Sequence, residues 1–218
     1  MEPFRLCLAL GPVAVYLLLL GVLNLSRRPF LVSGARDTAA LGLAVSGFVI
    51  VGPIELFFPE AAAVHFGPFV WLLLLVFYSL CVVLVVLTLR PRLVLYNISV
   101  DQLRPVLADL VDQLDPDARW AGDSLVMPTL SVQLYVDPSL LTRNVSLVSA
   151  GIKQNHLGWR QLELALAKKL DQHEFGRSLI GLVLLVMGLC VVAGLGTIIV
   201  QAPRDIATAL FDMLRLAQ

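Results

Sequence analysis

The sequence has few of the residues from which catalytic and metal centres are built. Charged residues make up only 15% of its 218 residues, and histidine and cysteine occur three times each. The cysteines, Cys7, Cys81 and Cys190, stand far apart inside apolar runs, so they have neither the clustered spacing of zinc ligands nor the loop positions of disulfides in secreted domains. The formal net charge is zero, which predicts no bulk attraction to nucleic acid.

Motifs of known catalytic chemistry are also absent from the sequence. It contains no recognisable pairing of an acid with a base, no nucleophile with a histidine partner, and no phosphate-binding glycine loop. The closely spaced aspartates between residues 109 and 123 lack the D-x-D-x-D-G pattern of a calcium loop. We therefore expect no catalytic residues, no cofactor and no metal site, and a membrane enzyme acting on lipid is the interpretation with the least support.

Apolar residues, in contrast, are abundant and gather in long runs. They make up 58% of the chain, and the mean hydropathy is +0.86, whereas soluble domains are about 45–50% apolar. Residues 6–26, 38–59, 66–89 and 178–200 each suffice to cross about 30 Å of hydrocarbon. We expect three spans within residues 1–89 and a fourth at 178–200. No small-x-small cleavage site follows the first run, which predicts a retained helix rather than a signal peptide.

Residues 90–177 differ in composition from the apolar runs, and this difference predicts a domain outside the membrane. Ten basic and ten acidic residues fall in this segment. Apolar residues spaced three and four apart after Ser99 predict an amphipathic helix, and a second helix is expected at 159–173. Alternation and turn residues predict strands at 92–98, 119–121, 124–127, 130–137 and 144–149. The expected fold is a membrane all-α protein with four transmembrane helices and an inserted small α+β domain, in which an antiparallel sheet packs against two helices.

Positive charge is distributed unevenly among the expected loops. The second loop, around residues 59–65, has no Lys or Arg. The first loop and the two ends of the domain contain six arginines: Arg27, Arg28, Arg36, Arg90, Arg92 and Arg177. Because short cytoplasmic loops are enriched in Lys and Arg, we expect residues 90–177 in the cytoplasm and the N-terminus outside, in a bacterial inner (plasma) membrane. Residues 201–218 are expected to form a short amphipathic tail on the outer surface.

Two sets of residues are candidates for specific roles within the membrane. Glu55 is the one acid inside a predicted span, and an ionisable group at that depth is a functional candidate by default. Glu60 and His65 are expected on the same side and complete a possible intramembrane polar site. Small residues at positions 40, 44 and 47 favour close helix packing, either within the chain or between copies. These helix-packing residues are Ala40, Ala44 and Gly47.

The composition and organisation favour a non-enzymatic multi-pass membrane protein. We expect a subunit, anchor or regulatory module that contacts the lipid bilayer. Its cytoplasmic domain or its spans would bind a protein partner or a second copy, and no nucleic acid. The alternative is a small oligomeric transporter or ion-conducting protein that uses Glu55, because four spans alone enclose only a thin pore.

Overall fold

A computed structural model describes residues 3–54, 56, 65–67, 69–139, 143–151, 154–173, 176 and 178–215, with side chains described as far as residue 209. The chain divides into two compact units. The helical unit comprises Met1–Leu19, Thr38–Thr88 and Leu184–Gln218. The sheet unit comprises Leu20–Asp37 and Leu89–Val183.

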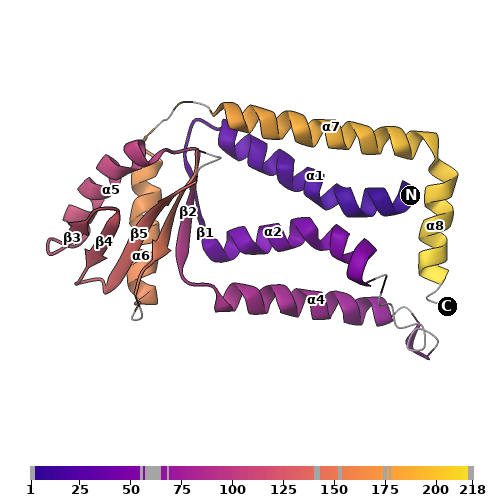
Figure 1. Cartoon of the computed structure of the whole chain (residues 1–218), viewed down its shortest axis with the longest axis horizontal. Helices are drawn as coiled ribbons and strands as arrows, with labels where there is room; N and C mark the ends of the chain where they lie inside the picture. The colour runs from indigo at the N-terminus through magenta and orange to yellow at the C-terminus, as the bar shows by residue number, and fades with distance from the viewer. Residues whose placement is uncertain are drawn as a thin grey trace. The chain divides into compact units, whose positions relative to one another are not determined.

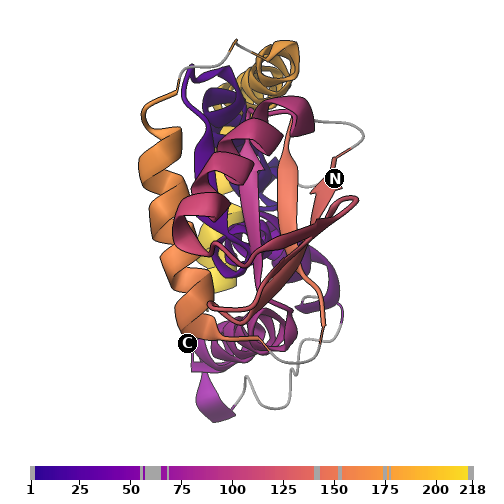
Figure 2. The same cartoon turned by 90° about the vertical axis from the view of Figure 1, so that its left-hand side faces the viewer.

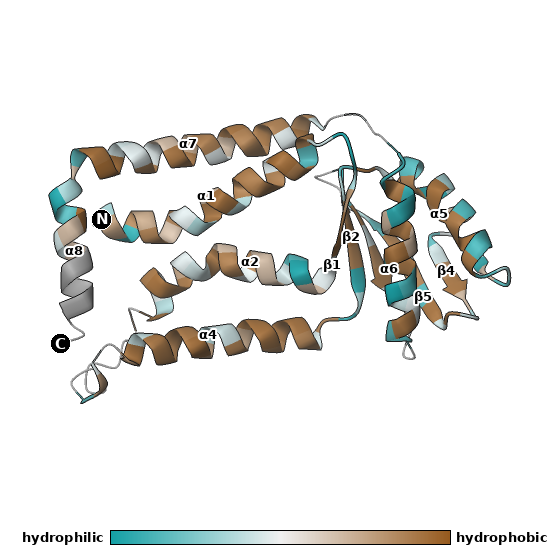
Figure 3. Cartoon of the chain, turned by 180° about the vertical axis from the view of Figure 1, so that it is seen from behind, coloured by the Kyte–Doolittle hydropathy of each residue, from teal (hydrophilic) through white to brown (hydrophobic). Residues whose placement is uncertain are grey.

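Four described helical segments are long and apolar enough to cross a membrane, as the sequence predicts. They are α1 (Pro3–Leu25), α2 (Gly34–Val49) with its continuation η1 (Ile50–Ile54), α4 (Phe69–Thr88) and α7 (Leu179–Gln201). Their residues are mostly hydrophobic (Figure 3), and few of them are buried in the chain, which is expected of helices that face lipid. The π-helical turn η1 contains Pro53, whose missing N–H interrupts the regular α-helical hydrogen bonding there.

A further helix, α8 (Pro203–Arg215), follows α7 after Ala202 and turns away from its axis (Figure 1). Proline at its first position suits a helix start, because the first N–H groups of a helix have no intrahelical acceptor. Ile206 is partly buried, whereas Arg204 and Asp205 are exposed. The part of α8 with described side chains therefore has one apolar and one polar side.

The sheet unit contains a six-stranded antiparallel sheet with the order β1-β2-β6-β5-β4-β3. Its strands are β1 (Phe30–Ser33), β2 (Arg92–Tyr96), β3 (Arg119–Ala121), β4 (Ser124–Met127), β5 (Val132–Pro138) and β6 (Val145–Ser149). The helices α5 (Val100–Leu114) and α6 (His156–Leu170) pack on it (Figure 2). At the start of α5 the Ser99 amide donates to the Gln102 side chain at 3.3 Å, one of the two hydrogen bonds of a capping box.

The core of the sheet unit lies between one face of the sheet and these two helices. Leu95, Leu134 and Leu147 project from neighbouring strands, and Leu107 and Leu166 come from the helices; all five are fully buried. The period of two in the strands and of three to four in the helices directs these leucines to one interface. The expected fold class is confirmed, with two helices covering one face of an antiparallel sheet.

The strand β1 is the element that the sequence patterns do not predict. It comes from the loop between the first two membrane helices and pairs with β2, with Phe30 opposite Tyr96 and Ser33 opposite Leu93. The loop between α1 and α2 therefore contributes a strand to the same sheet as β2. One end of three long helices belongs to the sheet unit: residues 20–25, 34–37 and 179–183 are part of α1, α2 and α7. The fourth, α4, ends at Thr88, directly before the sheet-unit segment that begins at Leu89.

Candidate functional site at the helix ends of the sheet unit

The first component of the candidate site is a hydrogen-bonded group around Asp37. This residue stands in the first turn of α2, where the helix dipole favours a negative charge. Its carboxylate accepts a hydrogen bond from the Tyr96 hydroxyl at 2.5 Å and pairs with Arg92 Nη2 at 3.1 Å. The side chains of Asp37 and Arg92 are only 19% and 35% exposed. A Cβ on Gly34 would overlap the Arg92 side chain, so glycine is needed for this approach of α2 to β2.

A second component is a group of buried polar side chains at the other end of β2. Asn97 follows β2 with φ +60°, a conformation that asparagine tolerates better than most residues, and its side chain donates to the Ser26 carbonyl at 2.5 Å. The Asn24 side chain donates to the Leu20 carbonyl at 2.9 Å, and the Ser178 amide donates to the Asn24 carbonyl at 3.4 Å. The ends of α1, β2 and α7 are thus connected by polar contacts.

Three oxygen atoms in this group are buried without a hydrogen-bond partner in the described part of the chain. They are Oδ1 of Asn24, Oδ1 of Asn97 and Oγ of Ser178. Leaving a buried acceptor unsatisfied costs on the order of 1–3 kcal/mol, and buried polar groups normally bind protein or water. These helix ends therefore have unused hydrogen-bonding capacity.

The third component is a set of exposed arginines. Arg27, Arg36 and Arg90 make no hydrogen bond or ion pair within the described residues. Arg28, in contrast, pairs with Asp171 at the end of α6 at 3.0 Å. That pair is well exposed on both sides, so its net contribution to stability is small, about 0–1 kcal/mol.

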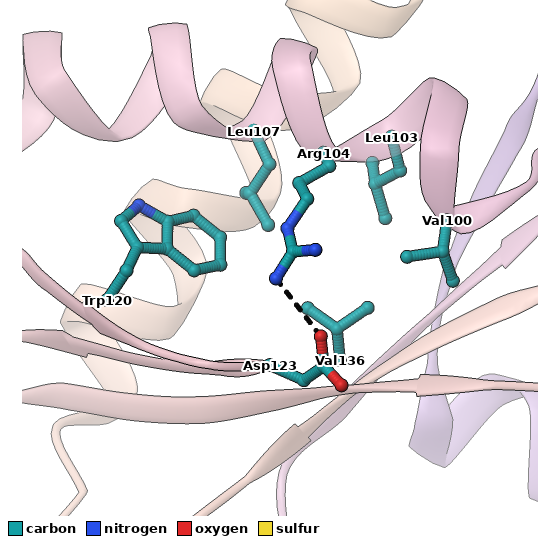
Figure 4. A pocket seen from close by; sticks show the side chains of 7 residues that line it. All are labelled: Val100, Leu103, Arg104, Leu107, Trp120, Asp123 and Val136. Atoms are coloured by element: carbon teal, nitrogen blue, oxygen red, sulfur yellow. Dashed lines mark hydrogen bonds and ion pairs between the residues drawn. The ribbon is translucent and has the colours of Figure 1, made fainter.

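A shallow hollow lies elsewhere in the sheet unit, between α5 and the strands (Figure 4). Its volume is about 210 Å³, part of which is open solvent. The lining residues are Val100, Leu103, Arg104, Leu107, Trp120, Asp123 and Val136. Arg104 crosses it to pair with Asp123 at 3.1 Å and to donate to the Gly122 carbonyl at 2.8 Å. The lining is apolar apart from this ion pair and contains no nucleophile beside a base, so it does not form a catalytic centre.

The predicted intramembrane polar site is only partly described. Glu55 and Glu60 lie outside the described residues, and their role stays a prediction. His65 is described and exposed. Among the described residues, no group of three or more His, Cys, Asp and Glu side chains is placed to hold a metal ion.

The predicted helix-packing residues occupy different surroundings. Ala40 is exposed, whereas Ala44 is buried. A Cβ on Gly47 would overlap the carbonyl oxygen of Leu8, so α2 lies directly against the α1 backbone at this point. Gly47 therefore packs within the chain, and a contact between copies through Ala40 stays a prediction.

Sequence reasoning missed Asn24, Asp37, Tyr96, Asn97 and Ser178 as members of one region. None belongs to a motif, and Asn24 and Ser178 stand at the edges of apolar runs like many span-terminal polar residues. Their proximity depends on β1, which pairs with β2 and so brings the first loop to the domain.

No family model, curated protein or solved structure matches the chain.

Proposed function

We propose that this chain is a non-enzymatic membrane module whose sheet unit lies in the cytoplasm, binds a protein partner there and transmits that binding to the spans. The observation that carries the proposal is the sharing of helix ends: all four long helices begin or end in the sheet unit or directly beside it. Few residues separate these helices from the sheet. Residues 26–29 connect α1 to β1, α2 starts directly after β1, and residues 89–91 connect α4 to β2.

Short connections of this kind leave little freedom between a strand and its helix. A partner that binds one arrangement of the sheet unit more tightly than another would shift the equilibrium toward that arrangement, and the helix ends would follow. The size of the shift is set by the difference between the partner's affinities for the two arrangements. The Asp37–Arg92 pair and the Tyr96 hydrogen bond strengthen this link between α2 and β2. Cytoplasmic placement is supported by the arginines of the first loop and by the pairing of that loop with β2.

The outer side of α6 offers a surface for the partner. Leu157 and Leu164, seven residues apart and therefore on one side of the helix, are 71% and 63% exposed. Arg160 and Lys168 are exposed beside them, and their side chains make no hydrogen bond or ion pair within the described residues. An apolar pair flanked by cations matches a partner helix that presents apolar side chains framed by carboxylates.

The test is purification of the tagged full chain from native membranes in mild detergent, followed by measurement of the mass and composition of the complex. We expect a second protein at a fixed ratio, and we expect Leu157→Gln/Leu164→Gln to lose it. The matched control Asp112→Gln/Asp117→Gln changes two exposed residues outside this surface and should retain the partner. A complex that contains only copies of this chain, in wild type and variants alike, would contradict the proposal and favour the oligomeric transporter.

A further inference from the structure

Three unpaired arginines stand at the ends of three different membrane helices. Arg27 follows α1 by two residues, Arg36 lies in the first turn of α2, and Arg90 follows α4 by two residues. All three side chains are exposed and have no hydrogen bond or ion pair within the described chain. Since the apolar helices end here, the guanidinium groups lie at the depth where hydrocarbon gives way to headgroups.

The pairing of β1 with β2 brings sequence neighbours of two of these arginines into contact. Gly34 lies against the Arg92 side chain, and Asp37 pairs with Arg92 at 3.1 Å. Arg36 immediately precedes Asp37 in the sequence, and Arg90 precedes Arg92 by two residues. Arg36 and Arg90 therefore flank the same contact between α2 and β2.

The local charge is positive, and the chain neutralises only part of it: Arg28 pairs with Asp171 and Arg92 with Asp37, which leaves Arg27, Arg36 and Arg90. Residues 20–37 and 89–92 contain five arginines but a single acid, Asp37. That carboxylate is already engaged by Arg92 and Tyr96. A surface with this excess of guanidinium groups attracts anions. Phosphate is a particularly good match, because two of its oxygens can accept hydrogen bonds from two parallel N–H groups of one guanidinium.

The position of β1 indicates that the anion comes from the bilayer. The strand follows α1 after four connecting residues, which reach about 14 Å at most, and it continues directly into α2. It is therefore held near the membrane surface along its whole length. Phe30, on β1, is 46% exposed, as expected of an aromatic side chain at headgroup depth.

We propose that Arg27, Arg36 and Arg90 bind the phosphate groups of anionic phospholipids in the leaflet on the side of the sheet unit. Arg27 lies beyond the Phe30 end of β1 and Arg36 beyond its Ser33 end, so the charges are spread along the strand. This spread fits several lipid headgroups side by side better than it fits one soluble phosphate. The lipids neutralise the excess charge and hold β1 at the surface.

The experiment compares the purified full chain in lipid nanodiscs of phosphatidylcholine with and without phosphatidylglycerol. Retained lipid is measured by native mass spectrometry and unfolding by the Tm. We expect retention of phosphatidylglycerol and a higher Tm in its presence, both weakened by high salt. Arg36→Gln/Arg90→Gln should lower the preference for the anionic lipid about fivefold per arginine, and the addition of Arg27→Gln should lower it further.

The matched control is Arg104→Gln/Arg119→Gln, which removes the same charge from α5 and from β3, the edge strand opposite β1. It should keep the lipid preference, and every variant should keep the wild-type Tm in phosphatidylcholine alone. Equal losses in the control and the test variant would overturn the proposal, because net charge would then be the cause. Displacement of phosphatidylglycerol by millimolar inorganic phosphate would assign the site to a free anion. The nanodiscs contain no partner protein, so a negative result in this experiment would not contradict the proposed partner surface on α6.

Discussion

Asp115 and Asp37 illustrate how surroundings decide the role of one residue type. Asp115 caps the end of α5 and is fully buried, and its carboxylate accepts hydrogen bonds from the Thr129 hydroxyl at 2.9 Å and the Thr129 amide at 2.8 Å. Burial raises the pKa of Asp115, but these bonds and one from the Asp117 amide outweigh it, so the pKa lies below its ordinary range. Asp115 thus stabilises a turn, whereas Asp37 connects α2 to β2.

At the residue scale, we predict that Asp115→Asn lowers the Tm of the sheet unit at neutral pH. The asparagine NH2 group would replace one carboxylate oxygen and would face either the Thr129 amide or the donors now bonded to Oδ1, the Thr129 hydroxyl and the Asp117 amide. The folded-state pKa of Asp115 is lowered, so its stabilisation is complete above the unfolded pKa of about 4 and is lost as the pH falls through the folded pKa. The Tm difference between wild type and variant should therefore narrow on acidification. Thermal unfolding in detergent across pH measures it.

The control for this prediction is Asp112→Asn, an exposed aspartate on α5 without a hydrogen bond among the described contacts. It should leave the Tm close to that of wild type at every pH. A Tm difference for Asp115→Asn that stays constant from neutral to acid pH would show that the loss comes from packing rather than from the charge.

At the scale of elements, the periodicity of apolar residues predicts the long or regular helices and strands but misses the short strand β1. The four membrane helices follow from apolar runs, and β5 follows from the alternation of residues 130–137. The helix α2 begins at Gly34, four residues before the predicted span, because the charged Arg36 and Asp37 occupy its first turn. Strand β1 has four residues and is too short for a pattern, so only its partner β2 defines it. The polar contacts of the candidate site depend on that pairing and were unpredictable for the same reason.

The register of β1 gives a prediction at this scale. Val32 is opposite Val94, so Val32→Cys/Val94→Cys should form a disulfide upon mild oxidation, since directly opposed Cα atoms lie within disulfide range. The background should lack Cys7, Cys81 and Cys190. The diagonal control Val32→Cys/Tyr96→Cys spans about 7–8 Å and should cross-link poorly. Mass spectrometry of proteolytic fragments detects the bond, and efficient cross-linking of the diagonal pair alone would indicate a different register.

At the scale of the whole molecule, the sheet restricts which arrangements in a membrane are available. If the four long helices cross a membrane, the pairing of β1 with β2 requires these two strands to lie on the same side of it. With four spans, we predict that the first turn of α1 and the helix α8 lie on the opposite side. The distribution of arginine predicts the cytoplasmic side for the sheet unit, as proposed above.

Labelling of single cysteines in intact cells tests that prediction. Ala121, in β3, and Thr208, in α8, are both exposed, and each can be changed to cysteine in a background without Cys7, Cys81 and Cys190. A membrane-impermeant maleimide should label Thr208→Cys in intact cells and should label Ala121→Cys only after the cells are opened. The reverse pattern would place the sheet unit outside, and labelling of both in intact cells would contradict the four-span arrangement. Labelling in opened cells, where both must react, controls for accessibility, so that protection in intact cells reports the membrane and not the fold.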